Sequence, residues 1–248
     1  MFSQLAAAFA DARSRRDVLA LQLVGNLLLM LLLWFWLGMG VGSIAMFATL
    51  LLLGIVLLSA SALLHGSGLA AFRPMTLGEA FSSARARLVK LTLYSLLIVA
   101  LLIAWDFAGM YSSAAAKWAA SAITFSSQSP VKPASLESSY SWLLRVVFLF
   151  VALALHPFAA RFAGSLDSAA RVLKQPAYWL GGILLAVVGL LIPWWLISWV
   201  PAFTAFSMEA VSAIIRFTLA YLLAIVSWVT IAAFMVRVGG SAETSATQ

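Results

Sequence analysis

The chain has 248 residues, of which 64% are hydrophobic and 9% are charged. Soluble domains carry about 25% charged and about 45–50% apolar residues, so this composition excludes a soluble globular domain and indicates a protein surrounded by lipid. The lack of cysteine excludes disulfides, thiolate metal sites and cysteine nucleophiles. The net charge of +7 does not indicate nucleic acid, because the basic residues flank apolar segments, where they set topology and meet anionic lipids.

Six apolar runs of roughly 20 residues are long enough to cross a bilayer. We expect transmembrane helices near 18–37, 41–64, 88–110, 140–162, 178–200 and 211–236. The first run is too long for the apolar part of a cleavable signal peptide, so we expect it to remain as a helix. The predicted fold is an all-α polytopic membrane helix bundle over 1–238, with a long outer loop over 111–139 and a disordered tail over 239–248.

The distribution of Lys and Arg predicts the orientation. If the N-terminus is cytoplasmic, eleven of the fifteen basic residues lie on the cytoplasmic side. Lys117 and Lys132 then fall in outer loops, while Arg145 and Arg216 fall inside spans. The positive-inside rule therefore predicts a multi-pass protein of the bacterial inner membrane with both termini in the cytoplasm.

Short amphipathic stretches precede the outgoing spans. In the clearest, over 76–87, Thr76 and Glu79 fit a capping box, in which each side chain accepts a hydrogen bond from a free backbone amide at the helix start. Apolar residues recur on one face at helical spacing, so this helix should lie in the headgroup plane. The basic residues predicted to contact anionic lipids from such stretches are Arg13, Arg15, Arg85, Arg87, Arg171 and Lys174.

An internal repeat links these elements. A shift of 72 residues aligns three pairs of less common residues, Phe9 with Phe81, Arg13 with Arg85 and Arg15 with Arg87. A fainter third copy precedes the fifth span, and His65 matches His156 in the returning spans. The pattern predicts a parallel repeat of three hairpins, each with an amphipathic helix, an outgoing span and a returning span. Inverted repeats, which are common in secondary transporters, are not part of this pattern, and this lowers the expectation of a transporter.

The segment 72–88, Phe-Arg-Pro-Met-Thr-Leu-Gly-Glu-Ala-Phe-Ser-Ser-Ala-Arg-Ala-Arg-Leu, is followed directly by a span. In this respect the chain resembles six-helix bacterial membrane proteins that are similar to the membrane domain found joined to glycerophosphodiester phosphodiesterases. The resemblance implies a six-helix bundle with interfacial helices and carries over no catalytic residues. Since these 248 residues hold no soluble phosphodiesterase domain, it does not imply that activity.

Two arginines lie within spans, a few residues from the predicted outer ends. Arg145 and Arg216 can snorkel to the outer headgroups, form charge pairs, or line a site for an anionic lipid or solute. Asp106, at the outer end of the third span, is the natural partner for Arg145, and Glu209 lies near Arg216.

Other polar residues in the spans have two interpretations each. Gln22 and Asn26 are four residues apart on one helix face, which we expect to point into the bundle and bond across helices, or else to line a polar substrate path. His65 and His156 share one predicted depth, and could ligate haem or a metal, or bond to water or a headgroup. We expect the second role, with no metal and no cofactor.

No catalytic pattern is present: the sequence has no zinc-protease His-Glu pair, phosphate-binding loop or nucleophile elbow. The outer loop 111–139 is the best candidate for partner binding, because so long a loop is typical of a lid or contact surface. Within it, residues 111–125 could form a helix that lies on the outer surface. We therefore expect a non-enzymatic structural or accessory subunit of a membrane complex, or a lipid-interacting scaffold, with lipids and other membrane subunits as partners and no nucleic acid. The alternatives are a transporter or channel for a small or lipidic solute, and a haem-binding subunit.

Overall fold

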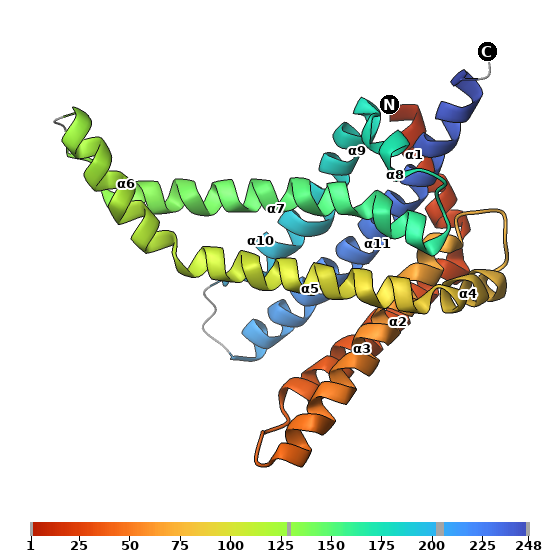
Figure 1. Ribbon diagram of the computed structural model, residues 1–248, viewed down its shortest axis with the longest axis horizontal. Helices are drawn as coiled ribbons and strands as arrows, with labels where there is room; N and C mark the ends of the chain where they lie inside the picture. The colour runs from red at the N-terminus through yellow and green to blue at the C-terminus, as the bar shows by residue number, and fades with distance from the viewer. Residues whose placement is uncertain (1, 128–129, 202–205, 247–248) are drawn as a thin grey trace. The chain divides into compact units, whose positions relative to one another are not determined.

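The computed structural model describes residues 2–127, 130–201 and 206–246, with the backbone alone for 241–246 (Figure 1). Within these ranges the fold is all-α, without strands, and six helical segments are long and apolar enough to cross a membrane, as predicted. These are α2 (Arg16–Leu37), α3 (Ile44–Ala70), α5 (Leu88–Met110), α7 (Pro133–Ala163), the segment Pro176–Ser198 and α11 (Phe206–Ala246).

The helix order repeats one scheme three times. A short helix leads into each outgoing span: α1 (Phe2–Ser14), α4 (Leu77–Ala86) and α8 (Ala169–Leu173). Each outgoing span is followed by a returning span, which gives the hairpins α2–α3, α5–α7 and Pro176–α11. This order matches the repeat expected from the sequence, with one addition, because the second hairpin carries an extra helix, α6 (Ser112–Ser127).

Three segment boundaries differ from the prediction. The predicted outer loop 111–139 is mostly helical, since α6 fills its Ser- and Ala-rich first half and α7 begins at Pro133 instead of Tyr140. Proline suits the first turn of a helix, where its missing N–H has no partner to lose, so Pro133 starts α7 without a penalty. Helix α11 continues to Ala246, where the sequence predicted a disordered tail from 239; residues 247 and 248 lie outside the described part.

The fifth span is irregular around Pro193. It consists of α9 (Pro176–Ala186), a π-helical turn η1 (Val187–Leu191) and α10 (Ile192–Ser198). Proline cannot donate to the carbonyl four residues earlier, and a π turn is one of the ways in which a helix accommodates such a break. The π turn also brings Gly189 against α11, where a Cβ on Gly189 would lie 2.5 Å from the Ser227 Cβ.

Contacts divide the chain into two compact units. Unit 1 comprises residues 1–93 and 156–248, and unit 2 comprises 94–155. In unit 2, α5 and α7 form a hairpin in which the Tyr94 hydroxyl donates to the Leu155 carbonyl at 2.6 Å. Near the other end of this hairpin, the rings of Trp105 and Phe148 lie 4.8 Å apart.

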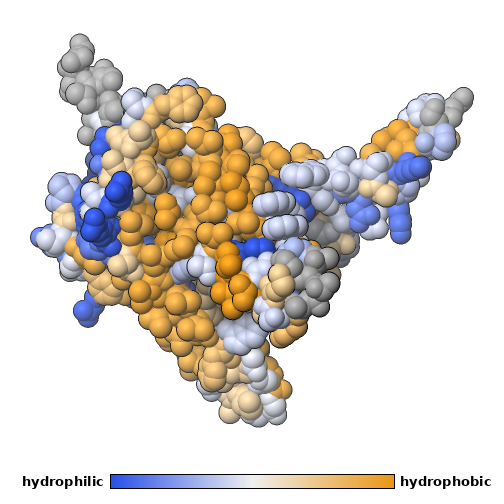
Figure 2. All heavy atoms as spheres, turned by 180° about the vertical axis from the view of Figure 1, so that it is seen from behind, coloured by the Kyte–Doolittle hydropathy of each residue, from blue (hydrophilic) through white to orange (hydrophobic). Residues whose placement is uncertain are grey.

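The core of unit 1 gathers at one end of its helices, which we call the amphipathic end because α1, α4 and α8 lie there. In α2 the buried residues are Val18 and Gln22, both near its start, and in α3 they are mostly in its last third. Toward the opposite ends of α2 and α3, most large apolar side chains are exposed. Helix α11 is different. In its most apolar stretch of 18 residues, 50% of the residues are buried, whereas 11% are buried in the corresponding stretches of α2 and α3. Figure 2 shows apolar residues over most of the visible surface.

Candidate functional site

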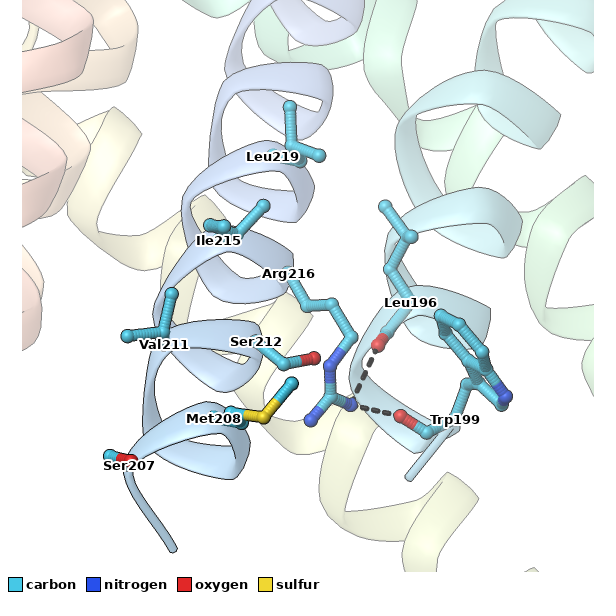
Figure 3. Close-up of a pocket in the computed structure, with 9 residues that line it drawn as sticks. All are labelled: Leu196, Trp199, Ser207, Met208, Val211, Ser212, Ile215, Arg216 and Leu219. Atoms are coloured by element: carbon cyan, nitrogen blue, oxygen red, sulfur yellow. Dashed lines mark hydrogen bonds between the residues drawn. The ribbon is translucent and has the colours of Figure 1, made fainter. Parts of the chain in front are cut away.

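A buried charge lies where α10 ends and α11 begins. Arg216, on α11, is only 8% exposed. Its Nη1 donates to the carbonyl of Leu196 at 3.2 Å and to the carbonyl of Trp199 (Figure 3). These are among the last carbonyls of α10, which lack partners within the helix and carry the negative end of its dipole. Arg216 therefore caps α10, a role that differs from the snorkelling and charge pairing considered from the sequence.

A pocket of about 550 Å³ lies beside this charge. Its walls come from α10 and one face of α11, and its lining residues are Leu196, Trp199, Ser207, Met208, Val211, Ser212, Ile215, Arg216 and Leu219. None of these residues is acidic, and the predicted neighbour Glu209 is not among them. The Arg216 Nε is buried without a hydrogen-bond partner. The pocket thus has a mostly apolar wall and one cation, Arg216, whose charge is balanced by no carboxylate among the lining residues.

Gln22 and Asn26 form a second polar group, near the amphipathic end. Gln22 is fully buried, and its Nε2 donates to the Leu64 carbonyl on α3 at 2.9 Å. Asn26 Nδ2 donates to the backbone carbonyl of Gln22 at 2.8 Å and to Gln22 Oε1 at 3.0 Å. Gly68 makes room for this arrangement, since any Cβ there would collide with Gln22 Nε2. The pair therefore joins α2 to α3 inside the protein.

The two histidines lie close to this group. His65 packs against Trp228 of α11, with ring centroids 5.0 Å apart, and its Nδ1 is buried without a partner. His156 lies within electrostatic range of His65. Within the described residues, no group of three or more His, Cys, Asp or Glu side chains is placed to hold a metal ion.

The arginines that match in the sequence repeat make matching contacts. Arg15 donates to the carbonyl of Ala71, directly after α3, and Arg87 Nη1 donates to the carbonyl of Ala163, the last residue of α7, at 2.8 Å. Each arginine thus caps the returning helix of its own hairpin. The sequence predicted lipid contact for both arginines. Their matching place directly before a span indicated a shared role but did not identify the carbonyl acceptors. The other four predicted lipid contacts, Arg13, Arg85, Arg171 and Lys174, have exposed side chains.

Gly164 completes the second of these caps. It has φ +83°, a left-handed conformation that residues with a Cβ rarely adopt, and the Arg87 guanidinium occupies the space that a Cβ would take.

A second, smaller pocket of about 170 Å³ lies nearby, where Arg73 pairs with Asp167 at 2.6 Å and donates to the Ser165 carbonyl at 3.2 Å.

The capping box predicted at α4 is confirmed. Thr76 N donates to Glu79 Oε2 at 2.7 Å, and Glu79 N donates to Thr76 Oγ1 at 3.3 Å. The hydrogen bond from the Thr76 amide favours the ionised carboxylate and lowers the pKa of Glu79 below its ordinary value.

The remaining predicted site residues, Arg145 and Asp106, belong to unit 2. The Arg145 guanidinium lies 5.2 Å from the centre of the Trp142 ring, a cation–π arrangement that sequence reasoning did not foresee. Asp106 is exposed on α5. An ion pair between these two residues stays a prediction.

Comparisons with protein-family models, with curated proteins and with solved structures found no match.

Proposed function

We propose that the chain is a non-enzymatic protein of the bacterial inner membrane, with both termini cytoplasmic. In this proposal it serves as a structural or accessory subunit of a membrane complex, or as a lipid-interacting scaffold. The six apolar helices indicate a membrane protein. The structural, accessory or lipid-interacting role is what we propose.

One observation carries this proposal: the intramembrane polar groups of unit 1 are used in separate structural contacts. Gln22 and Asn26 join α2 to α3 near the amphipathic end, whereas Arg216 caps α10. The Arg216 pocket includes neither Gln22, Asn26 nor His65 among its lining residues. A solute path needs polar groups that follow one another along a shared cavity, and the Arg216 pocket does not bring these groups together.

The first hairpin supports a role in an assembly. Beyond their buried ends, α2 and α3 are joined to each other by contacts such as the bond from Trp36 Nε1 to the Leu50 carbonyl at 2.8 Å. Large apolar side chains on both helices remain exposed, among them Leu31 and Leu52. This surface can meet lipid tails or the helices of another subunit with equal ease, because both are apolar.

Photo-crosslinking separates these two uses of the surface. A photoreactive residue at Leu31 or Leu52 in cells is expected to attach a distinct second polypeptide, and the same polypeptide should co-purify in mild detergent. Leu180, an exposed leucine on α9, is the matched control site outside this hairpin. Crosslinks to lipid alone at all three sites, with a chain that always migrates by itself, would contradict the accessory role.

A transporter or channel for a lipidic solute is the second candidate, and the Arg216 pocket is the observation that favours it. Proteoliposomes that contain the purified chain would then move an anionic lipid between leaflets faster than empty liposomes. The Arg216→Gln variant should abolish this movement if the pocket is on the path. Equal rates with and without the protein would remove the second candidate.

A further inference from the structure

We infer that the Arg216 pocket binds one anionic amphiphile, with a carboxylate or phosphate at the guanidinium and an apolar chain along α11. This inference rests on the lipid-interacting role proposed above and names the class of ligand for that role. It needs no partner subunit, so its test is independent of the crosslinking experiment.

The charge at this site is the first reason. Arg216 is 8% exposed, and its Nη1 donates to two backbone carbonyls, which are neutral. Neutral acceptors satisfy hydrogen bonds but leave the positive charge in place, and the pocket lining supplies no carboxylate. The buried Nε has no hydrogen-bond partner among the residues that the structure describes. A cation in these surroundings favours an anion, because the attraction between charges is strong where water is excluded.

The shape of the pocket is the second reason. Seven lining residues recur on α11 at spacings of one, three and four, so they form one stripe of a helix: 207, 208, 211, 212, 215, 216 and 219. The twelve residue steps from Ser207 to Leu219 rise about 18 Å, which is long enough to hold much of an acyl chain. Figure 3 shows Ile215 and Leu219 along α11 on one side of Arg216, and Ser212 and Met208 on the other. A small hydrophilic anion would leave this apolar wall unused.

The capping of α10 does not account for the charge. The cap needs hydrogen-bond donors and not a charge, and a neutral donor would avoid the cost of a buried charge in a membrane. Gln at position 216 removes the charge and keeps an amide donor on a shorter side chain, and the melting temperature of this variant measures how much of the cap it retains.

The experiment measures lipid binding to the purified full chain by native mass spectrometry. The probes are phosphatidylglycerol, phosphatidylcholine of the same chain length, and oleate. We expect one phosphatidylglycerol to bind at least tenfold more tightly than phosphatidylcholine, and Arg216→Gln to remove this preference with an unchanged melting temperature. Arg85→Gln removes one exposed charge from α4 and should leave the tight site intact, which controls for general attraction to basic surfaces. If oleate competes for the same site, the ligand is a fatty acid type of amphiphile; if it does not, the ligand is a phospholipid, and both results support the inference.

A second pair of variants keeps Arg216 in place. Val211→Trp fills the pocket, while Ile214→Trp adds the same ring to a position on α11 that is 66% exposed and does not line the pocket. Only Val211→Trp should weaken the tight site, by about the same factor as Arg216→Gln. The inference is overturned if phosphatidylglycerol and phosphatidylcholine bind equally to the wild-type chain. It is also overturned if Arg216→Gln retains the preference, or if the two Trp variants behave alike.

Discussion

The first and third hairpins of this protein have the same helix order but use it differently. In the first, α2 and α3 bury few residues beyond the amphipathic end, and most of their apolar surface is exposed. In the third, half of the most apolar 18-residue stretch of α11 is buried. This helix packs against glycines of α9 and η1 and carries a buried charge beside a pocket. Two copies of the same repeat unit thus differ in use. The third contains a packed helix with a candidate ligand site, and the first has a surface that remains available to lipid or partners.

The largest expected difference between these hairpins concerns their glycines. Gly189→Val should lower the free energy of unfolding by about 3 kcal/mol, because the added side chain meets the Ser227 Cβ and overpacks a fixed interface. Gly54→Val meets only the Trp36 ring, at 3.2 Å, and should cost about 1 kcal/mol or less, since that ring can shift. Melting temperatures of the two variants in one detergent check this order. Equal losses would show that the first hairpin is packed as tightly as the third.

Arg216 offers the next comparison. Arg216→Leu removes the donors to the Leu196 and Trp199 carbonyls but also removes a buried charge, so the net loss should be about 1.5 kcal/mol. In the first hairpin, Trp36→Phe removes a single neutral bond to the Leu50 carbonyl and should cost about 0.5 kcal/mol. Reversible unfolding in mixed micelles measures both. A more stable Arg216→Leu variant would show that the cap contributes nothing.

In the packed part of α2 and α3, replacement of Gln22 should lower the free energy of unfolding by a smaller amount. Gln22→Leu removes the donor to the Leu64 carbonyl and the Oε1 acceptor of Asn26, and hydrogen bonds between membrane helices contribute about 0.6 kcal/mol on average. We expect a loss of about 1 kcal/mol for the two contacts together. Asn26→Leu, which leaves the Leu64 bond intact, should cost less, and a larger loss for Asn26→Leu would reverse the assignment.

The smallest effect is the pH dependence of the α4 capping box, at the amphipathic end. The pKa of Glu79 is lowered in the folded chain. Its contribution to the stability of the α4 start is therefore complete above the ordinary glutamate pKa and is lost as the pH falls through the lowered value. The protection of the first α4 amides against hydrogen exchange, relative to the intrinsic rate at each pH, should therefore fall only in acid. Glu79→Gln should show no such step in this range, and a step of equal size in that variant would assign the pH response to another group.

The features that could be predicted from sequence are those set by local chemistry. Six runs of apolar residues gave the spans, and Thr76 with Glu79 gave the capping box, because each depends on neighbours in the chain. The failures depend on distant partners. Arg15, Arg87 and Arg216 bond to carbonyls at helix ends that lie 17 to 76 residues away, and no local pattern identifies such acceptors. A helix over 111–125 was one of two readings of the outer loop, because a composition of Ser and Ala suits both loops and helices, and α6 (Ser112–Ser127) agrees with the helical reading.

The most direct test of the central claim, six crossings in three hairpins, uses the natural lack of cysteine in the chain. Single cysteines at Ser14, Gly40, Ser126 and Gly240, all exposed positions, can be labelled in sealed vesicles with a reagent that does not cross the membrane. We predict that Ser14 and Gly240 are labelled from one side and Gly40 and Ser126 from the other. Labelling of Ser14 and Gly240 from opposite sides would contradict both the six crossings and the threefold repeat.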